Sequence, residues 1–461
     1  KDTVADGSDI QDRLANLINV PDINLRSNLY TTEDFLDSLQ VSKNYMADQN
    51  LYIRERIFDM WIGDWNKTNE NWEWQSHTVN DSVIYTPIVI DRNHAFTKVD
   101  GVLFKQMLKM LSLDFICNYD SLILKDTKKI NKLAFALDMA VAGRSDESVW
   151  IRQAQEIRKQ MTDSLIDSAF TYLPEGVKHD EIELIKRKLK RRRLELEAVA
   201  SQYYRLLQRT PVVAGTNQSD YFLIERQAPD RTILRIYDPE TGDCRLEQQF
   251  SGRETKELWL YGLAGNDTFE VKGNTRKDFP IYLISGEGEN QYQLNHNRKI
   301  HVYDKDYKYD YQKIKYHKIS FTPWGIYDSD KGISLGTFFT YTMYGFKRAP
   351  FTYQHRIGYN YLKGFMYAGV FPNYDGRRRL YLNASISSPR NFENFFGFGN
   401  NTAGYKEEKK NYNRVKLRTY MLNPSFEMDL RKEEVVTFFG SLDMYKAKRT
   451  DDRYIYTVYG E

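Results

Sequence analysis

The sequence predicts a multidomain α+β protein, and three patterns along its 461 residues support this fold class. Residues 1–210 carry apolar side chains at helical spacing, and residues 211–325 carry short β-branched and aromatic runs between turn residues. Residues 326–461 carry long segments in which apolar and polar residues alternate. A chain of this length is too long for one compact core. We therefore predict a mainly helical domain, a small β-rich domain and a large antiparallel sheet, in that order.

The helical pattern of residues 1–210 falls into several segments. Residues 32–65 repeat apolar side chains such as Phe35, Ile53 and Ile57 at helical spacing. We expect three further helices, the last of them introduced by Pro174-Glu175-Gly176, over residues 133–141, 150–170 and 180–208.

The last of these segments contains a strongly basic stretch. Residues 186–193 read KRKLKRRR, with seven basic side chains in eight positions. An anionic partner such as lipid phosphate, nucleic acid or an acidic subunit is one interpretation. The interpretation that we favour is a solvated helix surface, because acidic residues that could pair with it flank the stretch at helical spacing.

In residues 211–325, four runs separated by Gly, Asn and Asp predict strands at 221–225, 232–237, 258–261 and 281–284. Two turns in this region resemble each other, Gly265-Asn266-Asp267 and Gly288-Glu289-Asn290, and each is followed, after one intervening residue, by an aromatic residue. Their form is similar to calcium-binding repeat turns, so Asp267 and Asn290 are candidate Ca²⁺ ligands. Because only two copies occur and Asn290 replaces the second carboxylate, we favour stacked turns without a metal.

From about Ile333 onward the alternation extends over long strands. Ile333, Leu335 and Phe339 share one face, whereas Ser334 and Thr340 share the other. The same alternation recurs in residues 353–371, 380–387 and 436–444, and 21 of the 34 Tyr lie between residues 303 and 459. Long strands that are apolar on one face, polar on the other and rich in Tyr are typical of a transmembrane β-barrel. A soluble sheet with one exposed face is the alternative.

A closed barrel needs more strands than this pattern supplies. An open sheet edge in lipid leaves backbone groups unsatisfied. We count about five alternating strands, fewer than the eight of the smallest bacterial barrels. We therefore expect residues 326–461 to be the start of a barrel whose remainder lies beyond Glu461, in a longer protein of which this chain is an internal segment.

Composition and motifs exclude several functions. The net charge of +3 gives no reason to expect a nucleic-acid binder. No 18-residue apolar run predicts a transmembrane helix. No nucleophile-elbow, P-loop or dinucleotide-binding motif occurs, and the two cysteines, Cys117 and Cys244, form neither a disulfide framework nor a metal-ligand spacing.

The most specific motif is a pair of segments in the first domain. Residues 63–74 read GDWNKTNENWEW, and residues 88–96 read IVIDRNHAF. This pair resembles the catalytic loop and metal-binding segment of atypical kinases of the HipA and CotH type. It also resembles a Bacteroidota outer-membrane "surface antigen" family, whose members carry a kinase-like periplasmic domain and a barrel similar to outer-membrane assembly factors. Members of that family are often fused to an upstream calcineurin-like metallophosphatase.

Three other segments extend the resemblance to this family through most of the chain: residues 189–204, 254–263 and 394–400.

The resemblance assigns a role to individual residues. Phosphoryl transfer needs a carboxylate base, an amide five residues later and a second carboxylate to hold Mg²⁺. The base position falls on Asn66, the amide on Asn71 and the metal-binding carboxylate on Asp91. An amide cannot accept the substrate proton, so Asn66 makes this a degenerate site. Asp64 could replace the base, although it lies two residues away from the family position. Packing of an aromatic core is a further interpretation of this Trp-rich stretch.

Together these observations predict a non-catalytic segment of an outer-membrane β-barrel protein with periplasmic scaffold domains. We expect an accessory role in outer-membrane assembly or envelope biogenesis, with outer-membrane lipid and the proteins of an envelope complex as partners, and no nucleic acid and no cofactor. The alternative is a phosphoryl-transfer enzyme. It would use Mg²⁺ and ATP at Asn71 and Asp91, or act through a metallophosphatase domain upstream in the parent protein.

Overall fold

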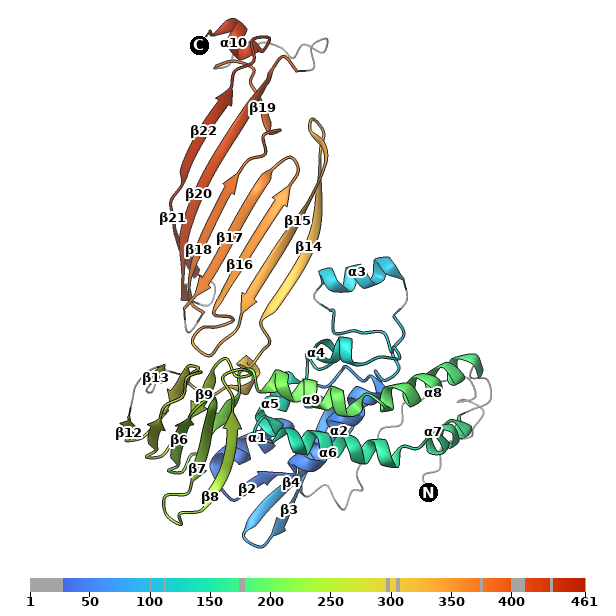
Figure 1. Ribbon diagram of the computed structural model, residues 1–461. Coiled ribbons are helices and arrows are strands. Elements are labelled where there is room, and N and C mark those ends of the chain that lie inside the picture. The colour runs from blue at the N-terminus through green and yellow to red at the C-terminus, as the bar shows by residue number, and fades with distance from the viewer. Residues whose placement is uncertain are drawn as a thin grey trace. The chain divides into compact units, whose positions relative to one another are not determined.

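The computed structural model describes residues 28–99, 101–111, 113–173, 179–295, 299–303, 307–373, 376–398, 411–431 and 434–460. The protein has the predicted α+β class, with helices, several sheets and one large antiparallel sheet (Figure 1). It forms two compact units, one of Lys1–Gly101 with Asp114–Gln312 and one of Val102–Leu113 with Lys313–Glu461. The predicted turn at 174–176, and Gly399 and Asn400 of the segment 394–400, lie outside the described residues.

The first unit begins with two helices and a small sheet. Thr31 caps α1 (Thr32–Val41) by accepting a hydrogen bond from the Asp34 N–H, and Asp48 caps α2 (Gln49–Ile62) in the same way through Leu51. Gly63 ends α2 in the left-handed conformation, at φ +80°. A four-stranded sheet accompanies the helices, in the order β1 (Leu29–Tyr30), β3 (Trp72–Val79), β4 (Ser82–Val89) and β2 (Tyr45–Ala47).

The remaining helices of this unit divide more finely than the sequence predicts. They are α4 (Thr127–Ile130), α5 (Phe135–Ala142), α6 (Glu147–Gln160), α7 (Asp163–Ala169), α8 (His179–Arg193) and α9 (Leu196–Leu207), with short 3₁₀ turns η3 (Asn69–Asn71), η4 (Leu124–Asp126) and η5 (Phe170–Tyr172). The single helix predicted over 150–170 is wrong because Thr162 caps a new helix by accepting the Leu165 N–H. The one predicted over 180–208 breaks at Leu194 and Glu195, whose N–H groups bond three residues back.

The β-rich part of the first unit consists of two sheets that share a core. The four predicted strands are confirmed as β6 (Tyr221–Gln227), β7 (Arg231–Tyr237), β9 (Leu258–Tyr261) and β11 (Ile281–Ile284). They are joined by β5 (Val212–Ala214), β8 (Cys244–Phe250), β10 (Thr268–Gly273), β12 (Gln291–Leu294) and β13 (Ile300–Tyr303). One sheet has the order β12-β10-β6-β7-β8 and the other β13-β11-β9-β5.

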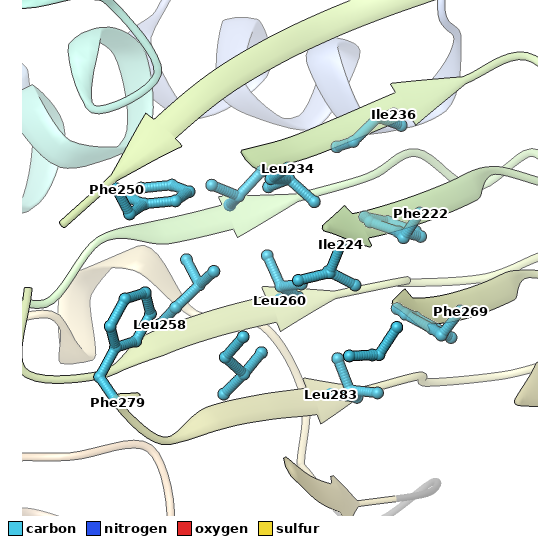
Figure 2. Packing of buried hydrophobic residues seen from close by; sticks show 13 residues of the cluster. Phe222, Ile224, Leu234, Ile236, Phe250, Leu258, Leu260, Phe269, Phe279 and Leu283 are labelled. Atoms are coloured by element: carbon cyan, nitrogen blue, oxygen red, sulfur yellow. The ribbon is translucent and has the colours of Figure 1, made fainter. Parts of the chain in front are cut away.

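The strands β6, β7 and β8 form an antiparallel meander within one sheet, and from β8 to β13 successive strands alternate between the two sheets. β10 pairs in parallel with β6 and β12, and β9 pairs in parallel with β5 and β11. From β9 to β13 the chain therefore coils, adding one strand to each sheet at every turn. Apolar side chains from both sheets fill the space between them, among them Phe222, Leu260 and Phe269 (Figure 2).

The second unit consists mainly of a nine-stranded sheet. The helix α3 (Val102–Met110) also belongs to this unit. Its strands are β14 (Lys318–Asp328), β15 (Gly332–Met343), β16 (Tyr353–Asn360), β17 (Gly364–Pro372), β18 (Arg378–Ile386), β19 (Phe392–Asn394), β20 (Arg414–Arg431), β21 (Glu434–Phe439) and β22 (Leu442–Lys448). All neighbours are antiparallel, and β21 and β22 both pair with β20. Within the described residues, β14 is an edge strand that pairs only with β15. The short elements η6 (Tyr311–Lys313) and α10 (Tyr454–Val458) precede and follow the sheet.

Candidate functional site

The kinase-like residues lie around the loop that connects α2 to β3 and the segment that follows β4. Asn71 Nδ2 lies 3.4 Å from Asp91 Oδ2, so the two side chains assigned to a metal are neighbours. Asn71 Oδ1 accepts hydrogen bonds from the N–H and the hydroxyl of Thr68, at 2.7 and 3.0 Å. The amide oxygen is therefore already used to fold the loop, which leaves the Asp91 carboxylate as the group suited to a cation.

Asp64, the candidate substitute base, is buried and paired. Lys67 Nζ donates to Asp64 Oδ2 at 2.5 Å and also donates to the main-chain oxygen of Asp91. Burial raises the pKa of the Asp64 carboxyl, an effect that Lys67 opposes. The N–H of Asn66, at the degenerate base position, donates to Asp64 Oδ1 at 3.3 Å. The structure thus brings Asp64, Asn71 and Asp91 into one region, but the carboxylate of Asp64 is held by a buried lysine.

A buried charge network that the sequence analysis missed lies beside this region. Arg56 on α2 donates to Asp138 of α5 at 2.7 and 3.1 Å and to Asp59 at 3.1 Å, and all three side chains are buried. Asp59 also pairs with Arg92 at 2.9 Å and with Lys67 at 3.6 Å. The only sequence signal was the three-residue spacing of Arg56 and Asp59 on the apolar face of a helix, because the other partners lie far apart in the chain.

Hydroxyl and amide groups complete the network around Asp138. Tyr52 donates its hydroxyl hydrogen to Asp138 at 2.7 Å and Tyr203 does so at 2.5 Å, while Asn131 accepts from Arg56 at 2.7 Å. Although burial alone would lower the pKa of Arg56, Asp138 and Asp59 raise it well above its ordinary value. These charges are fixed by one another inside the helical core, which suits a structural role.

The Trp residues of the kinase-like segment are part of the core. The rings of Phe35 and Trp74 stack with centroids 3.6 Å apart, and Tyr52 contacts Trp72 with centroids 4.9 Å apart. Trp61 and Trp65 are also buried. The Trp side chains of this stretch therefore pack in an aromatic core, which agrees with the aromatic-packing interpretation of the motif.

The basic stretch on α8 is largely occupied by contacts within the chain. Buried Arg192 donates to the main-chain oxygens of Met60 and Trp61 at 2.5 and 2.7 Å, which caps the end of α2. Lys188 donates to the Tyr119 main-chain oxygen, and Lys190 pairs with Asp167. Five of the seven basic side chains have such contacts, made also by Lys186 and Arg193. The stretch therefore joins helices of the first unit.

The two candidate calcium turns form a ladder with a third turn. The N–H of Asp267 donates to Asn290 Oδ1 at 2.9 Å, and the N–H of Asp220 donates to Asp267 Oδ1 at 2.8 Å. Thr216 donates to the Asp220 carboxylate at 2.7 Å. Each side chain thus accepts from the backbone of the preceding turn, which fits the stacked turns that we favoured. Among the described residues, no hydrogen-bond partner is found for Asp267 Oδ2.

We predict that Asp267→Asn flattens the dependence of stability on pH. Burial raises the pKa of the fully buried Asp267 carboxyl to about 8, although the hydrogen bond that it accepts from the Asp220 N–H opposes this effect. The folded state therefore binds this proton more tightly than the unfolded state, whose carboxyl has an ordinary pKa near 3.8. Its stabilisation is complete below pH 3.8 and is lost as the pH rises toward 8. One pKa unit corresponds to about 1.4 kcal/mol, so the loss amounts to a few kcal/mol.

Denaturant unfolding of the protein and of Asp267→Asn at pH 4, 6 and 8 tests this prediction. The amide retains an acceptor for the Asp220 N–H and carries no titrating proton, so the variant should be the more stable form at pH 8. Equal pH dependence in the two proteins would contradict a raised pKa at Asp267. Asp243→Asn, at an exposed turn, is the matched control.

Other features of the described residues bear on cofactors and membranes. No group of three or more His, Cys, Asp or Glu side chains is placed to hold a metal ion in the described part of the chain. Cys117 and Cys244 are both free thiols. None of the helices described is long and apolar enough to cross a bilayer.

Comparisons with known proteins give no relative for this chain. No protein-family model, no curated protein and no solved structure matches it.

Proposed function

We propose that this chain forms part of the wall of an outer-membrane β-barrel and carries a non-catalytic, kinase-like periplasmic scaffold. Its role would be that of an accessory component in outer-membrane protein assembly or envelope biogenesis. The observation that carries the proposal is the polarity of the nine-stranded sheet, one face of which has exposed apolar side chains, whereas the opposite face has most of the polar side chains.

Residues that pair across neighbouring strands form rows that run across the sheet, and adjacent rows lie on opposite faces. One row runs across six strands through Phe321, Phe339, Ile357, Tyr367, Ala384 and Leu422. Within it, Phe321, Phe339 and Ile357 are 50, 55 and 57 % exposed. The next row runs through Ser320, Thr340, Arg356, Ala368, Asn383 and Asn423. An apolar face of this kind is stable in contact with hydrocarbon.

Hydrogen bonds join the side chains of the polar face. Gln354 donates to the Thr342 hydroxyl at 2.8 Å, and Arg379 pairs with Glu427 and Asp429. Buried Ser334 donates to Asn360, whose side chain also accepts the N–H of Lys363 at 3.0 Å. These hydrogen bonds and ion pairs on one face, combined with exposed apolar groups on the other, support a wall between lipid and a polar interior.

This polarity distinguishes a membrane wall from a soluble sheet. In a soluble protein the apolar face would pack against a second layer, and contiguous exposed apolar patches rarely exceed a few hundred Å². The exposed apolar side chains here extend from β14 to β22, including Ile319, Leu335, Phe365, Phe438 and Met444. Fractionation of cells that contain the parent protein is the first test. Recovery in the membrane fraction after a carbonate wash supports the proposal, and recovery in the soluble fraction without detergent opposes it.

The scaffold role of the first unit rests on the state of the kinase-like residues. The base position is an amide, Asp64 is bonded to buried Lys67, and Asn71 Oδ1 is bonded to Thr68. Of the groups that phosphoryl transfer would need, the base is absent or held by Lys67 and the amide oxygen is used within the loop, so only the Asp91 carboxylate is left for a cation. Lys67 also pairs with Asp59 of the neighbouring charge network, and the Trp side chains of the motif are buried in the core. Both observations support a structural role for this segment.

We predict that the protein binds no ATP in the presence of Mg²⁺. Isothermal titration of detergent-solubilised protein with MgATP should give no heat of binding, and Asp91→Ala should behave in the same way. The control is Asp120→Ala, which removes a half-exposed carboxylate paired with Lys125. Binding that Asp91→Ala abolishes and Asp120→Ala preserves would contradict the scaffold role.

Phosphoryl transfer is the second candidate function, and the proximity of Asn71 and Asp91 is the observation in its favour. Asp91 could hold Mg²⁺, and Asp64 could act as base only if Lys67 released it. A metallophosphatase domain upstream in the parent protein would be a separate source of activity. Loss of phosphotransfer in Asp91→Ala, with wild-type activity in Asp120→Ala, would support an active site in this chain.

A further inference from the structure

The helix α3 is unusual among the helices of this protein because its apolar side chains face outward. Val102 and Leu103 are 76 and 86 % exposed, Leu111 just beyond the helix is 60 % exposed, and Phe104 and Met107 are each 45 % exposed. Of the α3 side chains whose burial is described, only Leu108 is buried. A helix that leaves so much apolar surface in water is not stabilised by that surface.

Four of the exposed apolar side chains, those of Leu103, Phe104, Met107 and Leu111, lie on one side of the helix, and Val102 lies on the other side. Residues three or four apart share a helix face, so Leu103, Met107 and Leu111 lie in line and Phe104 lies beside them. Lys105 and Gln106 project from the opposite side and are exposed. This division into an apolar side and a side with lysine is typical of helices that lie in the interface of a membrane.

The position of α3 within its unit connects it to the sheet. Together with the strands it forms one compact unit, in which it contacts β14. Ile319 and Phe321 of β14 belong to the apolar face of the sheet and are themselves exposed. The helix α3 therefore neighbours a strand whose apolar face is exposed, as the apolar side of α3 is.

We propose that α3 is an interfacial helix whose apolar side inserts into the lipid bilayer beside β14. The proposal rests on the membrane-wall role above, because the lipid that covers β14 is the occupant to which we assign the apolar side of α3. Leu103, Phe104, Met107 and Leu111 enter the boundary between headgroups and acyl chains, and Lys105 remains at the level of the lipid phosphates. A second protein is the competing occupant, and the experiment below distinguishes the two.

Depth-dependent fluorescence quenching tests this proposal in the full protein reconstituted into phosphatidylethanolamine and phosphatidylglycerol vesicles. Cys117→Ser and Cys244→Ser provide the background, and a single cysteine at Leu103 carries an NBD fluorophore. The vesicles contain lipids with a nitroxide either near the headgroup or deep in the acyl chain. Two matched positions are labelled in the same way: Phe339 on the apolar face of β15, and exposed Arg187 on α8.

We expect the label at Leu103 to be quenched most by the shallow nitroxide, whereas the label at Arg187 is quenched by neither. If Leu103 behaves as Arg187 does while Phe339 is quenched, the interfacial helix is wrong and the membrane wall stands. If Phe339 is not quenched, the membrane wall fails, and quenching at Leu103 alone would leave α3 as a separate membrane anchor. The label at Leu103 could also show the blue-shifted emission of an apolar environment without being quenched by either nitroxide lipid. This result would show that a protein covers α3 and would overturn the proposal.

Discussion

Replacing Arg56 by methionine is expected to lower the free energy of unfolding of the first unit by about 3–5 kcal/mol, because it leaves buried carboxylates without their partner. Asp138 would keep only its two tyrosine hydroxyls, and Asp59 would keep Arg92 and the more distant Lys67. Methionine fills much of the space of the arginine stem, so the loss reports on charge pairing more than on a cavity.

Urea unfolding followed by Trp fluorescence measures this change. Six of the seven Trp belong to the first unit, so the signal is dominated by that unit. The control is Arg158→Met, which removes a half-exposed ion pair with Glu197 and should cost about 1 kcal/mol or less. If the two variants lose equal stability, the network around Asp138 does not support the helical core.

The double variant Arg56→Met with Asp138→Leu distinguishes the contribution of the Arg56–Asp138 ion pair from the cost of a buried carboxylate without a partner. Removing both charges also removes the unpaired carboxylate, so the double variant should lose less stability than the sum of the two single variants. Additive losses would mean that Arg56 and Asp138 contribute independently.

Replacing Ile357 by arginine is expected to destabilise the membrane-inserted sheet by about 2–4 kcal/mol, because it places a charge on the lipid-facing side of a strand. Ile357 lies near the middle of β16, in the exposed apolar row. Asn383→Arg is the matched control, because Asn383 lies in the polar row that includes Arg356. In that row the new guanidinium faces a polar interior and should change stability little.

Urea unfolding of both variants folded into lipid vesicles, followed by protease protection of the sheet, gives the comparison. If the sheet were soluble, the order of the two effects would be reversed. Ile357→Arg would then place arginine in water and cost little stability, whereas Asn383→Arg would bury a charge inside the protein and cost more. Equal effects at Ile357 and Asn383 would remove the distinction between the two faces.

The fold could be predicted from the sequence where a local pattern determines it. The two faces of the large sheet follow from a period of two, so the separation of Phe339 from Thr340 is confirmed. Helix existence also followed from spacing, but the break at Thr162 did not, because a capping side chain outweighed a continuous apolar pattern. The parallel coil of the β-rich region was not predicted, since β9 and β11 pair across 23 residues of chain.

The candidate site also has features that a local sequence pattern predicts and others that it does not. A motif placed Asn71 and Asp91 together, and they are neighbours in the structure. The motif could not reveal that Lys67 bonds to Asp64, nor that Arg56 reaches Asp138, because 82 residues separate the latter two. Such long-range pairing depends on how α2 and α5 pack, which no local pattern encodes.

The most direct test of the membrane wall is a spin-label scan along β15 in the reconstituted protein. Single nitroxides from Ile333 to Met343 report collisions with oxygen, which concentrates in hydrocarbon, and with a water-soluble nickel complex. We predict a period of two, with oxygen accessibility highest at Ile333, Leu335 and Phe339 and lower at Ser334 and Thr340. High nickel accessibility at Leu335 and Phe339, with no oxygen maximum there, would show that water covers the apolar face and would contradict a lipid-facing sheet.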